Sequence, residues 1–224
     1  MSKQKLLLAL TGSVAAIKAL ELVKEFQSTY QIQIAATDST IKFLKTTNDL
    51  SVPYTNYGGA PLPEMFLDSF PLKDKWKIHS DVEEWKWNKI GNPITHIDLK
   101  DWADVFVIAP LSANTMAKLV HGICDNLVTS IYRAYPVDKP IVLAPAMNTD
   151  MWNHPLTQEH LEILYNRHKK IKVVKPVKKM LACGIEGIGA LAPAIDILNE
   201  VNDILPCPKC GASETSFSGC NCDI

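Results

Sequence analysis

Short apolar segments that alternate with helical patterns constrain the fold of this chain more than any other feature. Five such segments end near glycine, serine or proline, at residues 5–11, 32–37, 104–110, 140–145 and 171–174. Continuous apolar runs of this length are typical of strands that are buried on both faces. Apolar residues also recur at roughly helical spacing, over residues 14–26, 41–44, 114–120, 125–135, 153–165 and 194–205. The alternation predicts parallel strands joined by right-handed crossovers, and therefore an α/β fold, a three-layer Rossmann-like sandwich with a parallel sheet.

Length and composition fit one globular domain with a short tail. The 224 residues can bury a full core, since 47% of them are hydrophobic and 21% are charged. We predict a domain over residues 1–205, with an insertion at about 53–80, and a cysteine-rich tail over 206–224. A net charge of −1 gives no reason to expect nucleic acid or an anionic membrane as partner. The apolar run Leu6–Leu10 is too short for a signal peptide or a membrane span, so we expect a cytoplasmic protein.

The loops after the predicted strands carry most of the unusual residues, and ligands of such sheets bind at the carboxyl ends of the strands. After the first strand, Gly12 permits a tight turn and Ser13 offers a hydroxyl at the start of a helix, which suits a phosphate. Ser39 could contact the same phosphate or could cap the helix that follows it. Neither a G-x-G-x-x-G motif nor a Walker lysine loop occurs there, which argues against dinucleotides and ATP.

Three later loops combine small residues with a few polar groups. The small and hydroxyl residues at 109–115 would let a flat ring lie against the backbone. Asn148 stands between two methionines and could hydrogen-bond a substrate carboxylate or amide in an apolar pocket, or could cap a helix. Residues 181–190 contain three glycines and Cys183, which indicates a flap over a ligand. Cys183 could exchange a proton there or could be an inert thiol.

The remaining cysteines and the histidines give weaker signals. The spacing C-x2-C-x9-C-x-C in the tail supplies four soft ligands, as a small zinc knuckle would, at Cys207, Cys210, Cys220 and Cys222. The alternative is a disordered tail without metal. His96 precedes the strand at 104–110 within the sequence His-Ile-Asp-Leu. Surface or packing positions are expected for the other histidines, His79, His121, His154, His160 and His168.

Taken together, these loops resemble a known family. The stretches TGSVAAIK (11–18), HIDLKDWADVFVIAPLSANTMAKLVHGICDNL (96–127), KPIVLAPAMNTDMW (139–152) and LACGIEGIGAL (181–191) are similar to those of the homo-oligomeric flavin-containing cysteine decarboxylases. The resemblance is strongest to eukaryotic members that act on 4'-phosphopantothenoylcysteine. It implies a flavoprotein lyase that forms 4'-phosphopantetheine during coenzyme A biosynthesis. The insertion at 53–80 is longer than this family leads us to expect.

The same resemblance implies FMN as the cofactor and a site between the subunits of a homotrimer or an assembly of trimers. FMN would be bound by Gly12, Ser13, Ser39, Phe43, Ser112, Asn114, Thr115 and Ala146. The substrate would be bound by Asn148, Met151 and Ala182, with His96 near the flavin and Cys183 as the proton donor. The flavin would take a hydride from the carbon that bears sulfur, so that CO2 leaves beside a C=S electron sink.

Three other functions stay open at this point. A decarboxylase of peptide C-terminal cysteines shares the architecture and the Asn and Cys elements. A flavin prenyltransferase shares the fold and the flavin, although the combination of His96, Asn148 and Cys183 disfavours it. A non-enzymatic regulatory subunit of a protein phosphatase is the third, but such relatives typically carry acidic tails and divide these three residues between different chains.

Overall fold

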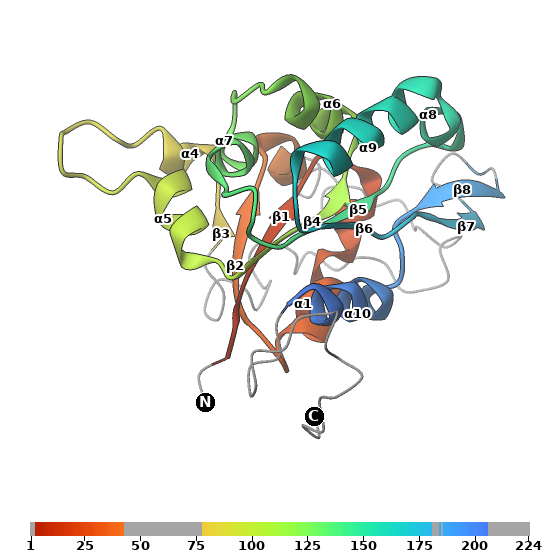
Figure 1. Ribbon diagram of the computed structural model, residues 1–224, viewed down its shortest axis with the longest axis horizontal. Coiled ribbons are helices and arrows are strands. Elements are labelled where there is room, and N and C mark those ends of the chain that lie inside the picture. Colours follow the sequence, from red (N-terminus) through yellow and green to blue (C-terminus); the bar gives the residue numbers. More distant parts are fainter. Residues whose placement is uncertain (1–2, 43–77, 181–183, 185, 206–224) are drawn as a thin grey trace.

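The computed structural model describes residues 3–42, 78–180, 184 and 186–205, which form a three-layer α/β/α sandwich (Figure 1). In this part of the chain, six strands form a parallel sheet in the order β3-β2-β1-β4-β5-β6. They are β1 (Lys5–Leu10), β2 (Gln31–Ala36), β3 (Ile78–His79), β4 (Val105–Leu111), β5 (Ile141–Pro145) and β6 (Ile171–Val173). The predicted fold class is confirmed, and the strand order reverses between β1 and β4.

Helices cover both faces of the sheet (Figure 1). One face carries the 3-10 helix η1 (Val14–Lys18), α1 (Ala19–Phe26) and α10 (Ala194–Ile204). The other face carries α5 (Thr95–Trp102), α6 (Ala113–His121), α7 (Leu127–Ala134), α8 (Thr149–Asn153) and α9 (Pro155–Arg167). The short helix α4 (Asp81–Glu84) follows the edge strand β3 directly.

Alternation of side chains along the strands divides the core into two parts. In β1, Leu6 and Leu8 face α1 and α10, while Leu7 faces the opposite helices. The register continues this division across the sheet, because Leu6 is aligned with Ile32 on one side and with Val105 on the other. Both faces of the central strands are therefore buried, which explains why their sequences are apolar without alternation.

The five predicted strands coincide with β1, β2, β4, β5 and β6 to within one residue. Two features are not predicted from the sequence: β3, which is only two residues long, and the antiparallel hairpin of β7 (Val177–Met180) and β8 (Glu186–Ala190). The predicted helix over 153–165 is in fact two helices. His154 separates them, because its Nδ1 accepts a hydrogen bond from the backbone N–H of Leu156 and Pro155 begins α9.

Much of the predicted insertion and all of the predicted tail fall at 43–77 and 206–224, outside the described residues. The division into a domain and a tail therefore stays a prediction. Within the described ranges, no helix is both long enough and apolar enough to span a bilayer.

Candidate functional site

The carboxyl ends of β1 and β4 lie side by side where the strand order reverses, which is where ligands of this fold bind. The buried Thr11 joins the two loops that leave these strands. Its Oγ1 donates to the carbonyl oxygen of Pro110 at 2.7 Å and accepts from the backbone N–H of Ser112 at 2.8 Å. The N–H of Ala146, after β5, donates to the carbonyl of Leu111 at 3.0 Å. These bonds hold the loops after β1, β4 and β5 together at the carboxyl edge of the sheet, and we call this edge the rim.

Three residues predicted to bind the phosphate of a flavin meet at this rim. A Cβ on Gly12 would lie 2.6 Å from the Cβ of Ser39, so the lack of a side chain at residue 12 permits the approach. Ser39 is exposed within helical residues 38–42. The Oγ of Ser13 accepts from the N–H of Ala15 and donates to the carbonyl of Ala146, each at 3.3 Å. Ser13 therefore caps η1 while it contacts the loop after β5. The fourth predicted residue, Phe43, lies outside the described residues.

The residues predicted to border the flavin ring begin α6. Ser112 is the N-cap of this helix, and its Oγ accepts from the N–H of Thr115 at 3.2 Å and donates to the Thr115 hydroxyl at 3.1 Å. Both side chains are buried, whereas Asn114 is exposed. The two hydroxyls are thus occupied in shaping the start of α6, and Asn114 presents its amide to solvent at the rim.

A cavity of about 290 Å³ opens beside Ser13 and Asn148. It lies between η1, the loop after β5 and the β7–β8 hairpin. Its apolar lining is Val14, Ala15, Ile17, Ala146, Met147, Met180, Ala190 and Leu191. Among the described residues, the charged ones that line it are Lys18 and Lys179. This lining suits a ligand with an apolar body and a few polar groups.

Asn148 combines the two roles that its sequence context leaves open. It is the N-cap of α8, where its Oδ1 accepts from the N–H of Asp150 at 2.8 Å, and it also lines the cavity. The hairpin is fastened to the same loop, because the N–H of Met147 donates to the carbonyl of Gly189 at 3.0 Å. Met151, also predicted to bind substrate, is 47% exposed and is not among the residues that line the cavity. Ala182 and Cys183 lie outside the described residues.

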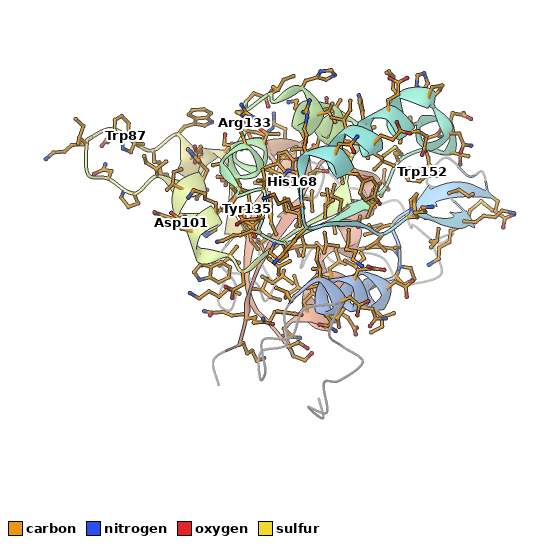
Figure 2. All side chains as sticks on the ribbon, viewed as in Figure 1. Trp87, Asp101, Arg133, Tyr135, Trp152 and His168 are labelled. Atoms are coloured by element: carbon orange, nitrogen blue, oxygen red, sulfur yellow. The ribbon has the colours of Figure 1, made fainter. Side chains whose placement is uncertain are left out.

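His96 lies apart from this cavity. It is the second residue of α5, near the β3 edge of the sheet, whereas Asn148 begins α8 beside the hairpin (Figure 1). Figure 2 shows the separation, since Asp101 of α5 and Trp152 of α8 lie on opposite sides of the molecule. The ring of His96 contacts Glu84, with 2.5 Å between Nδ1 and Oε1. Within one chain, the predicted catalytic histidine and the predicted substrate-binding asparagine are therefore not brought together.

The cavity and the histidine have neighbours whose roles the sequence does not indicate. Lys179 comes from β7, whose polar sequence gives no strand pattern, and Gly189 lies in β8, within the stretch 181–190 that is predicted to be a flap. Glu84 ends a four-residue helix, too short to show a period. No group of three or more His, Cys, Asp or Glu that could hold a metal occurs in the described part of the chain. The tail cysteines lie outside it, so zinc stays a prediction.

Comparison with known proteins shows the family. The family model described as Flavoprotein matches residues 1–205. The "Probable thymidylate synthase" of Schizosaccharomyces pombe is 41% identical over 91% of this chain, which spans only 30% of that protein's length. The "Probable phosphopantothenoylcysteine decarboxylase" of Arabidopsis thaliana is 42% identical over 85% of this chain and 83% of its own length.

Two solved structures are similar over most of their length. One is a cysteine-to-serine mutant of PPC decarboxylase complexed with pantothenoylaminoethenethiol, with a TM-score of 0.73 and 42% identity over 89% of this chain and 97% of that one. The other is the FMN-binding protein AtHal3, with a TM-score of 0.70 and 42% identity over 89% of this chain and 95% of that one. The chain therefore belongs to the flavoprotein family, together with the phosphopantothenoylcysteine decarboxylases.

Proposed function

We propose that this chain decarboxylates 4'-phosphopantothenoylcysteine to 4'-phosphopantetheine with FMN as cofactor. The observation that carries the proposal is the position of Asn148, which caps α8 and lines a mostly apolar cavity next to Ser13. A relative that is 42% identical is named as a probable decarboxylase of this substrate. A similar solved structure holds pantothenoylaminoethenethiol, which supports a pantothenoyl thiol as the ligand class.

The residues at the rim fit FMN. Gly12 leaves room between two loops that carry the hydroxyls of Ser13 and Ser39, and these would hold the phosphate. Ala146 and the exposed Asn114 would border the ring. Bound FMN would supply a reversible hydride acceptor for the carbon that bears sulfur. The similar structure named as an FMN-binding protein supports this choice of flavin.

The protein's own groups would bind the substrate and manage its protons. The Oδ1 of Asn148 faces the N–H of Asp150, so its amide NH₂ group is the part suited to donate to the substrate carboxylate. Cys183, at a position outside the described residues, would protonate the product-forming intermediate.

The separation of His96 from Asn148 supports a site shared between copies of the chain. Residues at opposite ends of one subunit can meet when identical subunits associate head to tail in a closed ring. The two ends here are α5 and the cavity beside the hairpin (Figure 1). We infer a homo-oligomer, a trimer or an assembly of trimers, in which His96 of one copy serves the cavity of its neighbour.

The first test is the visible spectrum of the purified protein, followed by mass spectrometry of the reaction with 4'-phosphopantothenoylcysteine. We expect a flavin spectrum and release of 4'-phosphopantetheine. Asn148→Asp keeps a capping oxygen but places a carboxylate opposite the substrate's own, so kcat/KM should fall by at least about 100-fold. Asn126→Asp is the control, because Asn126 is also an N-cap, its Oδ1 accepting from the N–H of Thr129 at the start of α7, and does not line the cavity. Flavin without product would exclude this substrate, and equal activity of the two variants would exclude the role of Asn148.

A second test addresses the shared site. His96→Gln and Asn148→Asp chains, each inactive alone, are coexpressed and purified as mixed oligomers. If each site takes one residue from each of two copies, random mixing restores both native residues in about a quarter of the sites. Activity that stays at the level of the single variants would show that both residues act within one chain.

A further inference from the structure

A single carboxylate holds His96 by two separate bonds. The Oε2 of Glu84 accepts from the backbone N–H of His96 at 3.1 Å, and its Oε1 lies 2.5 Å from the ring Nδ1. The side chain of Glu84 is 7% exposed and that of His96 is 25% exposed. The pair is therefore largely shielded from water at the carboxylate and reachable at the imidazole.

The helix that carries Glu84 is fastened on two sides, so the position of the carboxylate is fixed by the fold. Buried Asp81 accepts from the N–H of Leu127, at the start of α7, at 2.7 Å, and from the N–H of Asp38, after β2, at 3.2 Å. A capping box between Ser80 and Glu83 closes the beginning of α4. Packing of α5 against α4 and α7 completes the support for His96.

The contact with Glu84 determines which ring nitrogen of His96 faces away from the carboxylate and can interact with a ligand. An ionised carboxylate only accepts hydrogen bonds, so the ring nitrogen that faces Glu84 must carry a proton. This leaves Nε2 as the other nitrogen, an acceptor in the neutral ring and a donor in the charged ring. Glu84 also accepts from the backbone N–H of His96. This N–H lies in the first turn of α5 and therefore has no hydrogen-bond partner within the helix.

We propose that Glu84 is a positioning residue that fixes His96 as the Nδ1–H tautomer, with Nε2 presented to the reacting groups. The role in catalysis rests on the proposed decarboxylase function, whereas the tautomer can be measured without it. Carboxylates that orient a metal-ligating histidine in this way typically contribute about 10- to 100-fold to metal affinity or activity, and we expect a similar range for a histidine that acts without metal. The simpler view is that Glu84 only caps α5 through the backbone N–H.

Glu84→Gln separates the two views. The amide oxygen can still accept from the backbone N–H, but the amide NH₂ then faces Nδ1 and requires that nitrogen to be an acceptor. We therefore expect the variant to hold His96 as the Nε2–H tautomer and to lose about 10- to 100-fold in kcat with little change in KM. Asp101→Asn makes the same chemical change at an exposed carboxylate of α5, the helix that carries His96, and should alter neither quantity.

The measurement uses holoprotein labelled with ¹⁵N-histidine, with the His96 signals assigned by their loss in His96→Gln. The ring ¹⁵N shifts of the wild type should report protonated Nδ1, and those of Glu84→Gln should report protonated Nε2. Protonated Nε2 in the wild type would overturn the proposal without any need for a variant. A Glu84→Gln protein that keeps both the wild-type tautomer and the wild-type kcat would reduce Glu84 to a helix cap. Correct tautomers in a protein that does not decarboxylate the substrate would leave the orientation standing and refute the proposed function instead.

Discussion

The contact between Gly189 and the loop after β5 makes a strong prediction about stability and about the cavity. Gly189 has φ +154°, a conformation that L residues rarely adopt, and a Cβ added there would lie 2.1 Å from the carbonyl oxygen of Met147. Backbone strain of this kind costs about 1–3 kcal/mol, and forced overpacking costs a further 1–3 kcal/mol. The bond from the N–H of Met147 to the carbonyl of Gly189 would also be stretched. We expect Gly189→Ala to lower the free energy of unfolding by about 4 kcal/mol.

Thermal unfolding followed by circular dichroism measures this effect. For a domain of this size, about 4 kcal/mol corresponds to a fall in Tm of roughly 8–16 °C. Gly122→Ala is the control, because Gly122 also has positive φ, +71°, but a Cβ there would meet nothing within 4 Å. Its strain alone should cost about 1 kcal/mol, or roughly 2–4 °C. Equal Tm values for the two variants would refute the contact with Met147. Gly189→Ala should also raise KM, since the shifted hairpin forms one wall of the cavity.

Two further predictions follow from the rim and from the core. In Gly12→Ala the added Cβ would lie only 2.6 Å from the Cβ of Ser39. This clash should weaken FMN binding by at least about tenfold, as measured by flavin fluorescence titration. Gly91→Ala, where a Cβ would meet nothing within 4 Å, should bind FMN normally, and equal affinities would contradict the role of Gly12. Burial lowers the pKa of His168, so the folded protein binds this proton less readily than the unfolded chain does. The free energy of unfolding should therefore decrease as the pH falls below about 6.5. His168→Gln should reduce the accompanying fall in Tm. If Tm depends on pH equally in the variant and the wild type, His168 does not cause the decrease.

The sheet could be predicted from the sequence because its strands are buried on both faces. Such strands must be apolar throughout, and in β1, β4 and β5 every residue but Lys5 is buried. Elements that bury few apolar residues lack this pattern, which explains why β7 and α5 are not predicted from the sequence. The strand β7 reads Val-Lys-Lys-Met and is mostly exposed, so it shows neither an apolar run nor a clear alternation. The helix α5 buries only Leu99 and has no apolar stripe to reveal it.

The candidate site was predictable in part for a related reason. Gly12, Ser13 and Asn148 follow strands, and the carboxyl ends of parallel strands meet at one edge, so their proximity follows from the fold. The hairpin and Glu84 were not predictable, because their positions depend on contacts between segments far apart in the chain. Lys179 pairs with Gly187 of β8, and β8 is fastened to the loop after β5 by the bond between Gly189 and Met147, so Lys179 is placed at the cavity by contacts across the hairpin.

From the sequence, helix capping and ligand binding are alternatives for Ser39 and Asn148, yet Ser13 and Asn148 show that the two roles are linked in this fold. A residue that follows a parallel strand and begins the next helix is at once an N-cap and a member of the rim where ligands bind. Capping uses one acceptor: the Oγ of Ser13 accepts from Ala15, and the Oδ1 of Asn148 accepts from Asp150. The bond fixes the orientation of each side chain, and the Oγ of Ser13 at the same time donates to the carbonyl of Ala146 across the rim. The cap is therefore what holds the donor in place. It follows that Asn148→Ser, which keeps a capping oxygen but shortens the side chain, should preserve stability and still lose substrate affinity, whereas a loss of stability alone would mean that capping is the whole role of Asn148.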